Sequence, residues 1–188
     1  MRIKAVLLVA ALALLAGAVA LGVWVARHGF SAREKPSWVE AYLVRHARRI
    51  ATPAGARELR NPYPLTPERL VSARAHWADH CATCHALDGS GATAIGKNMY
   101  PPAPDMRDAT TQSLSDGELF YIISNGVRFT GMPAWGGEHS PEETWELVGF
   151  LRRLPALTLE ELKEMEEMAK TGSAGGHSHD PGGGPHAH

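Results

Sequence analysis

The sequence predicts a small all-α domain that follows a long apolar N-terminal helix. Three observations lead to this prediction. An uncharged apolar segment lies near the N-terminus, helix start signals precede apolar residues spaced by three and four, and few segments alternate between apolar and polar residues as strands do. The chain has 188 residues, which is enough for one modest domain with flanking segments.

The first element is the apolar segment of residues 5–26, which contains no charged residue. As a helix it would be about 33 Å long, close to the ~30 Å hydrocarbon core of a bilayer. A cleaved signal peptide is the alternative, with small residues at Ala18 and Ala20, but the apolar run continues beyond them and is long for a signal. We therefore expect residues 1–4 to flank an uncleaved transmembrane anchor at residues 5–26.

Residues 27–65 have the composition of a linker, with four prolines and a concentration of arginines. They hold eight Lys or Arg against three Asp or Glu, whereas residues 66–155 hold seven against eleven. One stretch of the linker places apolar residues on a single helical face, namely Trp38, Val39, Tyr42, Leu43, Ala47 and Ile50. This pattern predicts a basic amphipathic helix that lies on a membrane, docks a partner or packs on its own domain.

A compact domain is expected at residues 66–155. Thr66 is suited to cap a helix that begins at Pro67 and extends over residues 67–80. Ser115 and Glu118 fit a capping box for a second helix, which Gly126 would end.

Two further helices are predicted from similar signals. Ser140 and Glu143 fit a capping box for a helix over residues 141–154. Thr158 caps an acidic helix within residues 156–170, and Gly172 is expected to stop it. Residues 171–188 are mostly Gly, His, Ser, Pro and Ala, and we expect them to be disordered. A candidate Zn, Cu or Ni site in this segment would consist of His177, His179, His186 and His188. The alternative is a tolerated flexible tail.

The only two cysteines of the chain lie in the sequence Cys81-Ala82-Thr83-Cys84-His85. Cysteines at this spacing can form thioethers to one haem, and the histidine that follows can bind its iron. A thioredoxin-like dithiol would require alternating strands and helices, and a zinc site would have to recruit histidines, because no second cysteine pair exists. We therefore expect one covalently attached haem c.

The second iron ligand is expected to be Met132, which lies between Gly131 and Pro133 in a loop between two helices. The glycine allows the backbone to approach a ring closely, and the proline restricts the loop. Met99 is the second choice, and a buried filler of space is the alternative for either methionine. His139 would give two histidine ligands, but it adjoins the Ser140 cap.

In this order, these features resemble the monohaem class I cytochrome c family over residues 66–155. The residues that carry the resemblance are the Cys81–His85 motif with Asp88-Gly89-Ser90-Gly91 behind it, the proline-rich residues 101–104, Leu119 to Gly126, Gly131-Met132-Pro133 and the helix from Trp145 to Leu154.

The resemblance implies a cytochrome c-type helical fold wrapped around one covalent haem. In this fold the helix of residues 67–80 crosses the helix of residues 141–154 close to Trp77 and Phe150. Family members usually have glycine where Ala73 stands, which leaves the details of the crossing less defined.

The resemblance also implies residues around the haem. A proline carbonyl should accept a hydrogen bond from His85, with Pro102 and Pro104 as candidates. Tyr100 and Trp135 are expected to pack near the haem or to donate to a propionate, and packing is favoured.

The function implied is one-electron transfer rather than catalysis. The resemblance places the N-terminus in the cytoplasm and the haem domain on the periplasmic side of the inner membrane, as a single-pass protein. Redox partners would be a quinol-oxidising complex, a terminal oxidase or a dehydrogenase, with the domain either a free carrier or a subunit of such a complex. A net charge of −1 gives no reason to expect a nucleic-acid partner. Two alternatives are a haem gas sensor or peroxidase with an open sixth site, and a Cys/His metal-binding protein.

Overall fold

The structure is a computed structural model that describes residues 2–29 and 31–174. All regular structure in these residues is helical, with no strand among them, so the predicted all-α class is confirmed. The chain divides into two compact units after Glu34. The expectations for residues 175–188, including the four tail histidines, lie outside the described residues.

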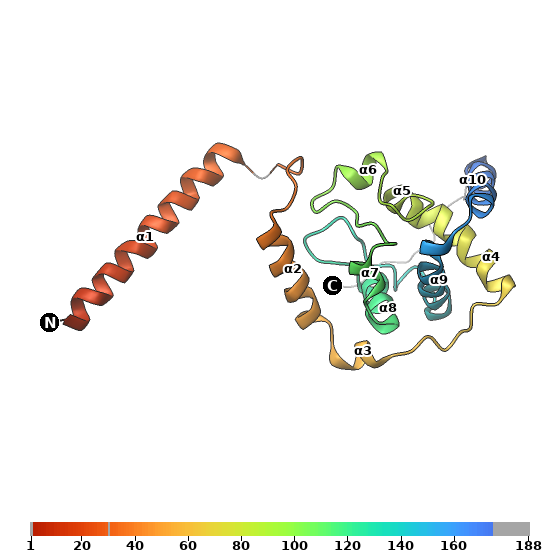
Figure 1. Cartoon of the computed structure of the whole chain (residues 1–188), viewed down its shortest axis with the longest axis horizontal. Helices are drawn as coiled ribbons and strands as arrows, with labels where there is room; N and C mark the ends of the chain where they lie inside the picture. Colours follow the sequence, from red (N-terminus) through yellow and green to blue (C-terminus); the bar gives the residue numbers. More distant parts are fainter. Residues whose placement is uncertain (1, 30, 175–188) are drawn as a thin grey trace, which may run out of the picture. The chain divides into compact units, whose positions relative to one another are not determined.

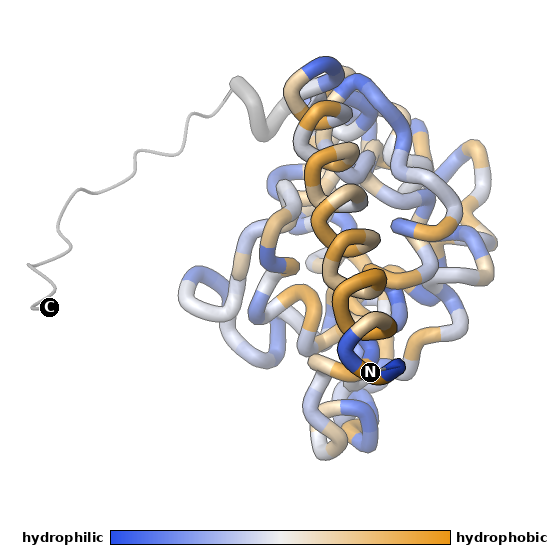
Figure 2. Tube along the Cα trace, turned by 90° about the vertical axis from the view of Figure 1, so that its left-hand side faces the viewer, coloured by the Kyte–Doolittle hydropathy of each residue, from blue (hydrophilic) through white to orange (hydrophobic). Residues whose placement is uncertain are grey.

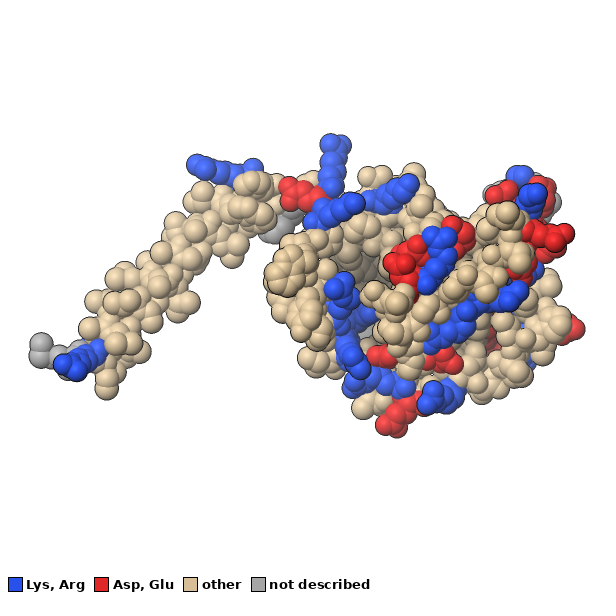
Figure 3. Space-filling view, viewed as in Figure 1, with Lys and Arg blue, Asp and Glu red and all other residues tan. Residues whose placement is uncertain are grey.

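The first unit contains one helix, α1 (Arg2–His28), which includes the predicted apolar segment. Its most apolar window has a mean hydropathy of 2.8 and buries none of its residues. Figure 2 shows the apolar character along the helix, and Figure 3 shows lysine and arginine at its ends but not along its length. By length and composition, α1 is a candidate membrane span.

The second unit begins with α2 (Trp38–Ala51) and α3 (Ala54–Glu58), both inside the segment with linker composition. The apolar face predicted for α2 stays exposed, at 81% for Trp38 and 82% for Ile50. Its polar side makes contact with the rest of the unit, because the Tyr100 hydroxyl donates to Glu40 over 2.5 Å. The exposed residues therefore do not pack on their own domain.

The helix that carries the cysteines consists of three continuous parts. They are α4 (Pro67–His76), the π-turn η1 (Trp77–Cys81) and α5 (Ala82–His85). The Thr66 hydroxyl caps the start by accepting from the Arg69 amide, as expected. The predicted end at residue 80 was wrong, because the backbone continues through a widened turn in which the Ala82 amide donates to the Trp77 carbonyl.

Short helices and three longer ones complete the unit, and their bounds are α6 (Ala94–Lys97), α7 (Ala109–Gln112), α8 (Asp116–Asn125), α9 (Pro141–Arg153), η2 (Leu154–Ala156) and α10 (Leu159–Ala174). The capping boxes predicted at Ser115 and Ser140 are both formed. The predicted stop at Gly172 was wrong, because α10 continues to Ala174.

The core lies where α4, η1, α8 and α9 meet, with α10 packed beside α4 and η1 (Figure 1). Trp77 and Phe150 are almost fully buried at this junction. Met165 brings α10 into the same core, with no exposed surface. Arg74 is also buried and forms ion pairs with Glu161 and Glu164 on α10. The core therefore fixes one face of the helix that carries the two cysteines.

Candidate functional site

Cys81, Cys84 and His85 occupy consecutive turns at the end of this helix. Cys81 is the last residue of the π-turn, and the other two belong to α5. Both cysteines are half-buried and free of any disulfide, and His85 is buried. The local sequence therefore places two thiols and one imidazole on a single short stretch of backbone.

The C-terminal end of α5 is held by partners for its last carbonyl groups, which no helical amide can satisfy. The Thr93 hydroxyl donates to the Cys84 carbonyl over 3.2 Å, and the Gly91 amide donates to the His85 carbonyl over 2.8 Å. The Trp77 indole donates to the Ala86 carbonyl over 3.0 Å. Gly96 lies directly against the Cys84 carbonyl, where a side chain would overlap it. These contacts fix the orientation of the cysteines and His85.

The imidazole of His85 has a buried nitrogen without a partner. Nδ1 forms no hydrogen bond of normal geometry with any described residue. Burial lowers the pKa of His85, and the nearby Pro104 carbonyl opposes this by raising it. Between the two prolines expected near this ring, the electrostatics single out Pro104. A neutral imidazole is the form of histidine that binds iron, and a carbonyl near the ring would help to fix its orientation.

The thiol of Cys81 lies in apolar surroundings. Burial, with a smaller contribution from Cys84, raises its pKa to about 12. Such a thiol is protonated at neutral pH and is a weak nucleophile, which argues against a thioredoxin-like dithiol. The thioether of an attached haem carries no charge, so it suits this environment better than a thiolate.

The loop that contains Met132 is fixed by its own backbone. The Val127 amide donates to the Met132 carbonyl over 3.1 Å, and the Met132 amide donates to the Thr130 hydroxyl over 3.1 Å. Gly126 has a φ of +65° and lies so close to Met132 and Pro133 that a Cβ there would crowd their backbone. Met132 itself is half-buried.

Met99 and Met106, two other methionines of this unit, occupy different environments. The sulfur of Met99 lies against Gly131, so Met99 and Met132 reach the same loop. Met106 packs against the hydrophobic core beside Gly89. Met99 is therefore the relevant competitor of Met132.

Tyr100 and Trp135 have defined partners within the chain. The Tyr100 hydroxyl donates to Glu40, and the Trp135 ring stacks on the His139 ring with centroids 4.9 Å apart. Pro102, the other proline expected near the imidazole, is half-buried in the same loop as Tyr100. His139, considered as an alternative ligand, has its Nε2 2.9 Å from Nε2 of His76.

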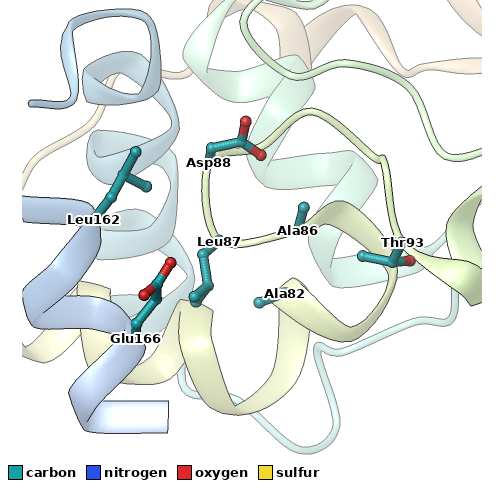
Figure 4. A pocket seen from close by; sticks show the side chains of 7 residues that line it. All are labelled: Ala82, Ala86, Leu87, Asp88, Thr93, Leu162 and Glu166. Atoms are coloured by element: carbon teal, nitrogen blue, oxygen red, sulfur yellow. The ribbon is translucent and has the colours of Figure 1, made fainter. Parts of the chain in front are cut away.

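A cavity of about 480 Å³ opens between α5, the loop after it and α10 (Figure 4). Ala82 and Ala86 line it on one side and Leu162 and Glu166 on the other. Neither cysteine nor His85 belongs to its lining, so this cavity is distinct from the face that presents the donor atoms.

The donor set fits a covalent haem. Two uncrosslinked thiols, a buried neutral imidazole and a methionine thioether are the groups that c-type attachment and low-spin iron require. The sequence predicts these residues as the candidate site, and the structure adds two features that this prediction does not include. The supports of α5 at Thr93 and Gly96 give no local signal, whereas the His76–His80 pair is detectable from its i, i+4 spacing.

Residues 68–151 match the family model described as cytochrome C oxidase, cbb3-type, subunit III. The match begins in the first turn of α4 and ends within α9, so it includes both the cysteine motif and the Met132 loop.

Proposed function

We propose that the chain is a membrane-anchored one-electron carrier in which Cys81 and Cys84 would hold a covalent haem c and His85 and Met132 would bind its iron. The match of residues 68–151 to a c-type cytochrome family model supports this proposal. The bound haem supplies an iron that alternates between Fe(III) and Fe(II). The observation that carries the proposal is the buried, neutral His85 at the end of a rigidly held Cys81–Cys84 turn.

The protein's own contribution is rigidity and exclusion of water. The contacts of Thr93 and Gly91 with the end of α5 hold His85 in one orientation, and the Pro104 carbonyl acts on its imidazole. The backbone hydrogen bonds of the 126–133 loop hold Met132 in a similar way. Ligands that do not move when the oxidation state changes keep the reorganisation small and leave no site for an external ligand. This arrangement suits an electron carrier better than a gas sensor or a peroxidase.

The location proposed for the domain is the periplasmic face of the inner membrane, with α1 as a single-pass anchor. Nine residues separate the end of α1 from the start of α2. A fully extended segment of this length spans at most about 30 Å, which limits how far the domain could move from its anchor. A domain confined in this way meets partners in the same membrane at a raised effective concentration. The partners proposed are a quinol-oxidising complex on one side and a terminal oxidase or dehydrogenase on the other, with the domain either a free carrier or a subunit of one such complex.

The ligand assignment is tested by exchanging each of the two competing methionines in the full-length holoprotein. Met132→Ala should abolish the weak red charge-transfer band of ferric methionine-ligated haem, lower the midpoint potential and permit CO binding to the ferrous protein. Met99→Ala is the matched control, because its sulfur lies beside the same loop, and it should leave the band in place. Loss of the band in Met99→Ala alone would assign the ligand to Met99, and a band retained in both variants would exclude methionine ligation by either.

A further inference from the structure

Three histidines outside the proposed haem site lie together at the edge of the core. They are His76 at the end of α4, His80 in the π-turn and His139 just before α9. One ligand atom from each lies within 4.8 Å of the other two. The nearest pair is Nε2 of His76 and Nε2 of His139, 2.9 Å apart.

The two helical histidines meet because of their spacing. His76 and His80 are four residues apart and share one face of the continuous helix, with ring centroids 5.0 Å apart. Paired histidines at this spacing on a helix are a recurrent metal-binding arrangement. The third ring arrives from a tight turn in which the His139 amide donates to the Trp135 carbonyl over 2.8 Å.

The surroundings of His139 fix the orientation of its ring. Its residue surface is only 8% exposed, and its Nε2 faces Nε2 of His76. The Trp135 ring stacks on the imidazole at an angle of 10°, which fixes the plane of the ring. The histidine is therefore held in a set orientation rather than packed as a filler.

The charges around the cluster favour a cation. The carboxylates that act electrostatically on His76 are Glu143 and Asp79, and Glu138 acts on His139. Burial, with smaller contributions from His139 and His80, lowers the pKa of His76 to about 4. Neutral imidazoles with acidic groups at a distance are the form in which histidine binds a metal ion.

We propose that His76, His80 and His139 bind one divalent transition-metal ion, with Zn²⁺ as the ion that three imidazoles fit best. Three histidines and a water molecule form a common four-coordinate zinc site with Zn–N distances of about 2.0–2.1 Å. Tetrahedral geometry at those distances separates two ligand nitrogens by about 3.3 Å. The observed separations of 2.9 Å and up to 4.8 Å bracket this value, so small rotations of the rings would form the site.

A metal ion at this site would connect two segments that also carry residues of the proposed haem site. His80 directly precedes Cys81, and His139 lies in the loop that continues from Met132 through Trp135. A metal ion bound to both would join the cysteine-bearing helix to the loop of the proposed sixth ligand.

The experiment measures Zn²⁺ binding to the full-length holoprotein by equilibrium dialysis after removal of metals with a chelator. In the holoprotein both cysteine sulfurs are thioethers of the haem, so they do not compete with the histidines for Zn²⁺. The four tail histidines are replaced by alanine in every sample, because they are an independent source of zinc binding. The expected result is one Zn²⁺ per chain in this background, with affinity at least about 100-fold weaker in His80→Ala. His46→Ala, an exposed histidine on α2, is the matched control and should bind as the background does.

His80 is exposed, so its replacement should leave the fold and the haem spectrum unchanged, and the visible spectrum of each variant verifies this. His76→Gln provides a second test and should weaken binding to a similar extent. The proposal is overturned if the background protein binds no Zn²⁺ at micromolar concentration. Zinc bound equally well by the background, His80→Ala and His76→Gln would overturn it too.

Discussion

Trp77 and Phe150 pack edge to face, with ring centroids 5.6 Å apart and ring planes inclined by 61°. This contact joins the start of the π-turn that ends at Cys81 to the C-terminal part of α9, and both side chains are almost fully buried. Aromatic pairs in this geometry contribute stability beyond the area that they bury. The pair therefore connects the stability of the core to the position of the cysteine motif.

Phe150→Ala should lower the free energy of unfolding by about 3–5 kcal/mol, because it leaves a cavity at the contact with Trp77. Chemical denaturation of the holoprotein measures this change. Phe129→Ala is the control, since Phe129 is 93% exposed and its replacement should change stability by less than about 0.5 kcal/mol. Equal effects of the two substitutions would show that Phe150 does not belong to the core.

Gly96→Ala should destabilise the holoprotein by about 1–3 kcal/mol, because the new methyl group would overlap the Cys84 carbonyl. The same substitution at Gly55, in α3, meets no atom within 4 Å and should be neutral or stabilising by up to about 1 kcal/mol. Thermal unfolding and the yield of protein with attached haem measure both. If Gly96→Ala behaves like Gly55→Ala, the loop does not support the end of α5 as described.

Glu161→Gln should destabilise the protein at pH 7 by about 1–3 kcal/mol, because it removes a charged partner from the buried Arg74. The Thr158 amide and then Arg153 hold the pKa of Glu161 below its ordinary value of 4.5. A carboxyl group whose pKa is lower in the folded state than in the unfolded state stabilises the fold at pH values above its unfolded-state pKa. This contribution is lost as the pH falls through the folded-state pKa.

The difference in stability between wild type and Glu161→Gln should therefore stay constant from pH 7 to about 5 and shrink below about 4.5. Denaturant titrations at several pH values test this dependence. Glu160→Gln, on the exposed side of the same helix, should show little effect at any pH. A difference that grows as the pH falls would contradict the ion-pair explanation.

The features predicted from the sequence are those set by neighbours along the chain. The capping boxes at Ser115 and Ser140 involve a side chain and an amide three residues apart, so the sequence alone identifies both helix starts. The cysteine motif is local for the same reason. The widened turn at Trp77–Cys81 and the burial of Met165 depend on packing between distant helices, which leaves no local pattern.

The candidate site divides in the same way. Spacing predicts Cys81, Cys84 and His85 as the haem-binding residues. It leaves Pro102 and Pro104 as equal candidates for the carbonyl near His85, and in the structure the Pro104 carbonyl acts on that imidazole. The meeting of Met99 with the Met132 loop is also a tertiary contact, since more than thirty residues separate them. His139 was considered only as an iron ligand, because its contact with His76 spans 63 residues.

The central claim is that haem is attached at Cys81 and Cys84 and that its iron has no vacant position. The most direct test combines the intact mass of the full-length protein, produced in a host that attaches haem, with a CO titration of its ferrous form. The mass of one haem added per chain, with no change in the spectrum on adding CO, is the predicted result. A mass without added haem, or ready binding of CO by the unmodified protein, would contradict the account.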